Sequence, residues 1–132
     1  MSARRASCMC GGLSLTCEGE PFRISVCHCL DCQRRSGSSF AAQVRYPAEQ
    51  VTVTGEARVF TRTAESGHAS EHHFCPNCGC EMWYVARPFR EMMAIPIGRF
   101  AEPGFPAPEY SVYESRKHAW VAIAGEATEH YD

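Results

Sequence analysis

The sequence predicts a mainly β fold, and two of its features lead to this class. Apolar side chains recur at every second position in several short segments, which is typical of half-buried strands. Glycine and proline stand between these segments at plausible turns, and one short helix is expected beside the strands. With 132 residues, 45% of them hydrophobic, the chain is most simply one domain over residues 1–132.

The strands are predicted in order along the chain. The alternating apolar positions are Leu13, Leu15 and Cys17; Phe22, Ile24 and Val26; Phe40, Ala42, Val44 and Tyr46; and Val51 and Val53. Further strands are expected at 57–63, 70–74, 81–85 and 92–97, with turns at Gly55, Gly67, Gly79 and Pro88.

Three segments are predicted not to be strands. A short helix is expected at 31–36, directly after the middle group of cysteines. Segment 102–108 holds three of the eight prolines and one glycine, so we expect an irregular surface connection there. A last apolar piece is expected at 120–123, beginning with Trp120.

Charge and hydropathy exclude several classes of partner. Thirteen Lys and Arg stand against fifteen Asp and Glu, a net charge of −2, which argues against a nucleic-acid partner. No stretch approaches the roughly 18 apolar residues of a membrane span, and no apolar leader region follows the first residues. We therefore expect a soluble, cytoplasmic protein. In that reducing compartment, clustered cysteines are more often metal ligands or redox groups than disulfides.

Seven of the nine cysteines fall into three tight clusters. The clusters are Cys8 and Cys10; Cys27, Cys29 and Cys32; and Cys75 and Cys78. A structural zinc ion takes four ligands, whereas a reactive zinc ion keeps one position open beside about three protein ligands. Seven thiols therefore suggest one closed site and one open site.

The closed site is predicted to join the first and last clusters. Cys8 and Cys10 share a face in an extended chain, and Gly79 allows a tight turn after Cys75 and Cys78. Closing so long a loop costs roughly 4 kcal/mol plus a constant, whereas a structural zinc supplies roughly 10 to 16 kcal/mol. The alternative is a thioredoxin-like redox motif, which needs a following helix, whereas 81–85 reads as a strand.

The middle cluster, Cys27, Cys29 and Cys32, lacks a local fourth ligand, which favours an open site. The alternatives are a closed site completed by His28, Cys80 or a distant histidine, or a zinc ribbon with the last cluster. The distant histidines considered are His68, His72 and His73. His28 is expected to point away from the metal. His72 and His73 are interpreted first as strand residues facing opposite ways.

Further candidates surround the middle cluster or lie in the predicted core. Arg34 and Arg35 could offset thiolate charge or bind a carboxylate, and Ser36 and the backbone near Gly37 could stabilise a developing oxyanion. Cys17 is expected to be a buried apolar residue, and the role of Cys80 is left open. The aromatic residues that could fill the core, line a pocket or form a docking surface are Trp83, Tyr84, Phe89, Phe100 and Phe105.

The motifs CMCGG, CHCLDCQRRSGSSF and FCPNCG, in this order and spacing, resemble the glutathione-dependent formaldehyde-activating enzyme family, which includes centromere protein V-like domains. The resemblance implies a β-tent fold of several coiled antiparallel sheets pinned by a structural zinc. It places Cys8, Cys10, Cys75 and Cys78 on that ion, and Cys27, Cys29 and Cys32 on a second, catalytic zinc. It further implies a carbon–sulfur lyase that joins formaldehyde and glutathione into S-hydroxymethylglutathione.

An open zinc site fits this chemistry, because the ion would lower the pKa of an arriving small-molecule thiol and hold it as a nucleophile. Two other functions are weighed against it. One is a non-catalytic zinc scaffold of the same fold that binds a protein partner. The other is thiol redox chemistry, as in methionine sulfoxide reductase B, with Cys17 or Cys80 as the reactive thiol.

Overall fold

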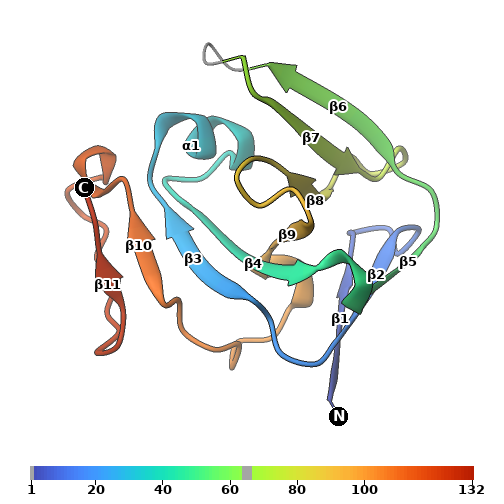
Figure 1. Ribbon diagram of the computed structural model, residues 1–132, viewed down its shortest axis with the longest axis horizontal. Coiled ribbons are helices and arrows are strands. Elements are labelled where there is room, and N and C mark those ends of the chain that lie inside the picture. Colours follow the sequence, from blue (N-terminus) through green and yellow to red (C-terminus); the bar gives the residue numbers. More distant parts are fainter. Residues whose placement is uncertain (1, 64–66) are drawn as a thin grey trace.

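The computed structural model describes residues 2–63 and 67–132, and strands dominate this part of the chain (Figure 1). It contains eleven strands in two sheets and one α-helix, so the predicted mainly β class is confirmed. Three short 3-10 helices complete it, η1 (Ala48–Gln50), η2 (Ile97–Phe100) and η3 (Glu114–Arg116). None of the helices in these two ranges is long and apolar enough to cross a bilayer.

The smaller sheet has three antiparallel strands in the order β1 (Ala3–Ser7), β2 (Ser14–Glu18) and β5 (Val51–Thr54). Strand β2 carries the alternation that the sequence predicts, because Leu15 and Cys17 are both fully buried. Strand β5 only partly fits that prediction. Val51 packs against the core, but Val53 on the same edge strand is 41% exposed.

The larger sheet has eight strands, which Figure 1 shows curving around the molecule. Their order is β11 (Glu129–His130), β10 (Tyr110–Val112), β3 (Arg23–Cys27), β4 (Ala41–Pro47), β9 (Met92–Pro96), β8 (Glu81–Val85), β7 (Ala69–Phe74) and β6 (Arg58–Thr63). The pairings are antiparallel except that β10 runs parallel to both β3 and β11. The expected antiparallel arrangement holds for every pairing except those of β10, because a long irregular connection over 101–109 brings β10 to β3 in the parallel direction.

The interior strands β3 and β4 are buried on both faces, not on one as the alternation predicts. Ile24 and Val44 are buried as expected, but Ser25 and Gln43 are buried too. The Gln43 side-chain amide nitrogen donates to the Ser25 hydroxyl at 3.1 Å, which gives these two atoms a partner. Phe22, expected on the buried face, is 52% exposed because it precedes β3.

A single apolar core lies between the sheets. Its fully buried members are Ala6, Leu13, Leu15, Cys17, Val44, Tyr46, Met82 and Ile95. Segment 102–108 is irregular, as predicted. The expected apolar piece at 120–123 is only partly confirmed. Val121 is buried, but Trp120 is 75% exposed and the segment forms neither strand nor helix.

The predicted short helix is present as α1 (Leu30–Ser36). It begins at Cys29, whose side chain accepts a hydrogen bond from the backbone N–H of Cys32 and so acts as the N-cap. It ends at Gly37, which adopts a left-handed conformation with φ 71°. The helix is therefore built around the middle cysteine cluster, which its first turn positions.

Candidate metal centres and the adjoining cavity

Four thiols from two distant turns meet at one point. Cys8 and Cys10 follow β1, and Cys75 and Cys78 lie in the turn between β7 and β8. Their Sγ atoms all lie within 4.8 Å of one another. The distances are 3.7 Å for Cys8–Cys10 and 3.6 Å for Cys10–Cys75. A zinc ion with thiolates at about 2.3 Å in a tetrahedron requires sulfur atoms about 3.8 Å apart, so the donor set fits this metal.

Backbone N–H groups donate hydrogen bonds to the sulfur atoms of the four-thiol site. The N–H groups of Leu13 and Gly12 point to Cys8 Sγ at 3.3 Å and Cys10 Sγ at 3.4 Å. Hydrogen bonds from the Asn77 side chain and from the Gly12 N–H lower the pKa of Cys10, which favours the thiolate, the form that binds a metal. The pKa of Cys78 is lowered to about 5, chiefly because the backbone amides of Cys80 and Cys10 donate to it.

Glycines shape the turns of this site, and one of them, Gly55, lies in the connection between β5 and β6. Gly11 and Gly79 adopt φ 81° and 78°, conformations that a side chain would disfavour. Gly55 has φ 105°, and a Cβ atom there would lie 2.1 Å from the carbonyl oxygen of Gly12. The turn after Cys10 can therefore form only because residue 55 has no side chain.

The second cluster is local and contains three thiols. Cys27 ends β3, Cys29 caps α1 and Cys32 lies in the first helical turn, and their Sγ atoms lie within 4.8 Å of one another. Among residues 2–63 and 67–132, no fourth histidine, cysteine or carboxylate joins this group within that distance. These thiols are distinct from Cys75 and Cys78, so the structure gives no support to a ribbon that pairs the middle and last clusters.

Charge and hydrogen bonding favour one thiolate within the three-thiol cluster. The pKa of Cys32 is lowered to about 5 because the Cys27 thiol hydrogen-bonds to it, and Arg35 adds to the effect. The Arg35 Nη2 atom lies 3.8 Å from Cys32 Sγ. The pKa of Cys27 is raised by its hydrogen bond to Cys32 and by burial. The cluster therefore holds negative charge next to Arg35.

His28 lies between two of these thiols in sequence but is turned away from them, as expected. Its side chain is fully buried, and Nε2 is hydrogen-bonded to the Ser111 hydroxyl at 2.9 Å on strand β10. Burial lowers the pKa of His28, which favours the neutral ring. We therefore interpret His28 as a structural link between the three-thiol segment and β10.

A cavity of about 590 Å³ opens beside Cys32. Helix α1 forms one wall through Arg34 and Arg35, and strands β6, β7 and β8 form the other. The residues on these strands include Phe60, Arg62, Ser70, His72, Glu81 and Tyr84. The volume of this cavity lies within the range of small-molecule sites in proteins.

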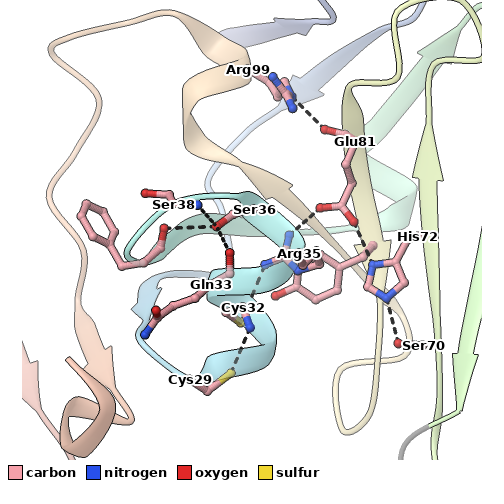
Figure 2. A network of polar contacts seen from close by, with 12 residues as sticks. Cys29, Cys32, Gln33, Arg35, Ser36, Ser38, Ser70, His72, Glu81 and Arg99 are labelled. Carbon is pink, nitrogen blue, oxygen red and sulfur yellow. Dashed lines mark hydrogen bonds and ion pairs between the residues drawn. The ribbon is translucent and has the colours of Figure 1, made fainter. Parts of the chain in front are cut away.

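A polar network crosses this cavity wall (Figure 2). Arg35 forms an ion pair with Glu81, whose second carboxylate oxygen, Oε2, lies 2.8 Å from Nδ1 of His72. Nε2 of His72 lies 2.8 Å from the hydroxyl of Ser70. Arg99 Nε donates to the backbone carbonyl of Glu81 at 2.8 Å, which fixes the start of β8. The side chains of Arg35, His72 and Glu81 are mostly buried, between 14% and 17% exposed.

The structure separates the four residues predicted after the middle cluster. Arg34 and Arg35 line the cavity beside Cys32, whereas Ser36 lines a second hollow of about 360 Å³ on the other side of Arg35. The Ser36 hydroxyl lies 3.4 Å from the carbonyl oxygens of Gln33 and Phe40. Because Gly37 ends the helix, we interpret Ser36 and Gly37 as residues that shape the helix end.

The two neighbouring histidines of β7 face opposite ways, as expected. His72 lines the cavity, whereas His73 stacks on Trp83 with ring centroids 4.2 Å apart. Sequence reasoning missed Glu81 and Ser70 as site residues. Ser70 could have been found, because it shares the face of His72 two positions along the strand. Glu81 had no such signal, since its pairing with Arg35 spans 46 residues.

The remaining candidates lie in or against the core. Cys17 is fully buried, and burial raises its pKa to about 12, so it is the apolar residue that the sequence suggests. Cys80 and Phe105 pack against the core, while Trp83 and Phe100 belong to it. The Phe89 ring packs at a tilt against Phe22 outside the core, with centroids 5.7 Å apart, and Tyr84 is the one of the five aromatic candidates that lines the cavity beside Cys32.

Comparison with known proteins agrees with the motifs. Residues 3–116 match the family described as glutathione-dependent formaldehyde-activating enzyme. A Fusarium vanettenii protein whose name places it in this family is 25% identical over 114 residues, which are 84% of this chain and 61% of that protein. The chain thus spans less than two thirds of that relative. The crystal structure of a Rhodobacter sphaeroides protein shares the fold, with a TM-score of 0.57 and 18% identity over 77% of this chain and 90% of that one.

Proposed function

The chain belongs to the glutathione-dependent formaldehyde-activating enzyme family, and we propose that it is a zinc-dependent carbon–sulfur lyase. Its substrates would be glutathione, or another small thiol, and formaldehyde or a related small aldehyde. The observation that carries this proposal is a three-thiol cluster, one ligand short of a closed zinc site, beside a cavity of about 590 Å³. A scaffold with only structural zinc would require neither the missing ligand nor the cavity.

The proposal assigns two zinc ions to the two clusters. Cys8, Cys10, Cys75 and Cys78 would hold the structural ion, since their sulfur atoms lie within 4.8 Å of one another and the Cys8–Cys10 and Cys10–Cys75 distances match the edge of a zinc tetrahedron. The three cysteines of the middle cluster would hold the second ion. When bound there, zinc supplies a fourth position in which an incoming thiol binds with a lowered pKa.

Arg35 would balance the charge of the site. Three thiolates on one divalent ion leave a net charge of −1, and a bound thiolate substrate adds another negative charge. Arg35 lies 3.8 Å from Cys32 Sγ and is only 16% exposed, so its charge is poorly screened by solvent. Its ion pair with Glu81 holds the guanidinium in place against the cluster.

Arg34 and Arg62 would bind the charged ends of the thiol substrate. Both line the cavity, one from α1 and one from β6. Arginine binds carboxylates through two parallel hydrogen bonds, and glutathione carries two carboxylates. Arg62 already forms an exposed ion pair with Asp31 at 3.3 Å, which a substrate carboxylate could replace at little cost.

Calorimetric titration of glutathione into the zinc-loaded protein tests this function. We expect heat of binding at or below millimolar glutathione, because the sulfur completes the shell of the middle cluster. Cys29→Ala removes one ligand of that cluster and should abolish the heat, whereas Cys80→Ala, outside both clusters, should keep it.

The matched ligand is S-methylglutathione, which has the same charges but no free thiol. We expect it to bind at least about tenfold more weakly. Equal binding of the two ligands would show that the sulfur is not held by the cluster. An absence of heat at millimolar glutathione would favour the scaffold instead.

A further inference from the structure

We propose that Ser70, His72 and Glu81 form a proton relay that carries the thiol proton to the aldehyde oxygen. This inference rests on the function proposed above. The three side chains are arranged in line as hydroxyl, imidazole and carboxylate. The Ser70 hydroxyl lies 2.8 Å from Nε2 of His72, and Nδ1 lies 2.8 Å from Glu81 Oε2. A base oriented by a third group is the arrangement that moves protons in many enzymes.

The relay lies where the reaction would take place. Ser70, His72 and Cys32 all line the same cavity. Arg35 connects them, because Nη2 contacts Cys32 Sγ while Nη1 is paired with Glu81. Figure 2 shows Arg35 between Cys32 on one side and Glu81 with His72 on the other. One guanidinium thus links the thiol cluster to the relay.

The surroundings of His72 fix its ring and its tautomer. Tyr84 stacks on the ring with centroids 5.6 Å apart, and the ring of Phe60 lies 6.2 Å away on the other neighbouring strand. The carboxylate of Glu81 can only accept a hydrogen bond, so Nδ1 carries the hydrogen. Nε2 is then the acceptor of the Ser70 O–H.

Charged groups from three elements surround His72. Glu81 on β8 contacts the ring directly, and Arg35 on α1 contacts Glu81. Tyr84 on β8 lies against the ring, while Arg62 on β6 pairs with Asp31 at the cavity wall. An imidazolium formed at His72 would therefore face a carboxylate at 2.8 Å, and that carboxylate is paired with Arg35 as well.

The relay takes up one proton from the thiol and returns one proton to the product. The thiol gives its proton through the Ser70 hydroxyl to Nε2 of His72, and the sulfur keeps the electron pair. That pair forms the bond from sulfur to the aldehyde carbon, while the π pair of the carbonyl moves to the oxygen. The oxygen then takes the proton back from Ser70, which His72 resupplies. Thiol and aldehyde give the hydroxyalkyl thioether with no other reactant.

Turnover and binding of matched variants test the relay. His72→Gln should lower kcat for S-hydroxymethylglutathione formation by about 100-fold, the usual contribution of general acid–base catalysis, with no change in glutathione affinity by calorimetry. His73→Gln is the control, because this neighbour on the same strand stacks on Trp83 away from the cavity. Exchange NMR with labelled formaldehyde gives the rate after subtraction of the rate without protein.

A second measurement does not depend on activity. Long-range ¹H–¹⁵N NMR of the full chain without substrate should show His72 as the Nδ1–H tautomer, with its signals identified by their loss in His72→Gln. The Nε2–H tautomer would overturn the relay. So would an active wild type whose His72→Gln variant keeps more than half of its kcat. A wild type that leaves the uncatalysed rate unchanged removes the proposed function, and the relay with it.

Discussion

Cys17 illustrates how burial, at the scale of a single residue, decides what a thiol can do. Its side chain is fully buried in the core, and this burial raises its pKa to about 12. An ordinary cysteine has a pKa near 8.5, and only the thiolate is reactive. Cys17 therefore cannot serve as the nucleophile of a redox enzyme near neutral pH, although the sequence left that role open.

We predict that Cys17 resists alkylation in the folded, zinc-loaded protein. At pH 8 its thiolate fraction is lower by roughly a thousandfold than that of an ordinary thiol, so iodoacetamide should label it at least that much more slowly. Mass spectrometry of the labelled peptides measures this, and the protein unfolded in urea with a chelator is the control. Rapid labelling of Cys17 in the folded protein would contradict the burial.

The same pKa shift predicts how stability depends on alkaline pH. Below about pH 9 the Cys17 thiol is protonated in both the folded and the unfolded chain, so it contributes no pH dependence. Between about pH 9 and 12 the unfolded chain releases a proton that the folded chain keeps, and stability falls. Urea unfolding at pH 8 and pH 10 should therefore show a larger loss for the wild type than for Cys17→Ala.

Site residues that lie close together in the sequence could be predicted, whereas site residues that meet only in the folded chain could not. The cysteine clusters and the two arginines after the middle cluster are local patterns, and the structure places them together. Glu81 reaches Arg35 only because β8 lies beside the helix in the folded chain. Conversely, Ser36 and Gly37 are adjacent to the cluster in sequence, but the end of α1 turns them away from Cys32.

At the scale of elements, apolar alternation predicted the strands that contribute several core side chains. Strand β2 is an example, since Leu15 and Cys17 are fully buried. Three strands were missed, β1, β10 and β11. Only Ala6 of β1 is buried, and β10 and β11 have three and two residues, so none of them carries a periodic pattern. Backbone pairing with β2 or β3 holds β1 and β10 in place, and this pairing leaves no signature in composition.

The connection between β5 and β6 supports the four-thiol site, and Gly55→Ala tests this support. The new Cβ would lie 2.1 Å from the carbonyl oxygen of Gly12 at a backbone φ of 105°, so the turn that carries Cys10 must shift. We expect a loss of roughly 2 to 4 kcal/mol in the free energy of unfolding, measured by urea denaturation. Competition with a zinc chelator should show that Gly55→Ala holds the proposed ion of the four-thiol site more weakly than the wild type does.

Gly104→Ala is the matched control for this substitution. It lies in the irregular segment 102–108, and an added Cβ would meet no atom within 4 Å. Its effect should stay within about 0.5 kcal/mol, as for most surface substitutions. Equal stability of the two variants would show that the close approach of Gly55 to Gly12 is not required for the stability of the fold.

At the scale of the whole molecule, the two cysteine clusters differ in what they connect. The four-thiol site joins the turn after β1 to the turn between β7 and β8, and Cys10 and Cys75 are 65 residues apart. It therefore ties the smaller sheet to the larger one. The three-thiol cluster spans only 27–32, and its local geometry comes from β3 and from the first turn of α1.

This difference predicts that the two proposed zinc ions leave with different consequences. A structural zinc contributes roughly 10 to 16 kcal/mol, which equals or exceeds the roughly 5 to 15 kcal/mol net stability of a whole domain. Chelator titration should therefore remove the ion of the three-thiol cluster first, with the near-ultraviolet circular dichroism unchanged. Removal of the ion of the four-thiol site should then unfold the protein. Cys29→Ala should bind one zinc and stay folded, whereas Cys78→Ala should lose its cooperative melting transition. Equal loss of fold in both variants would contradict the assignment, because a local cluster and a cluster that joins two sheets would then stabilise the molecule alike.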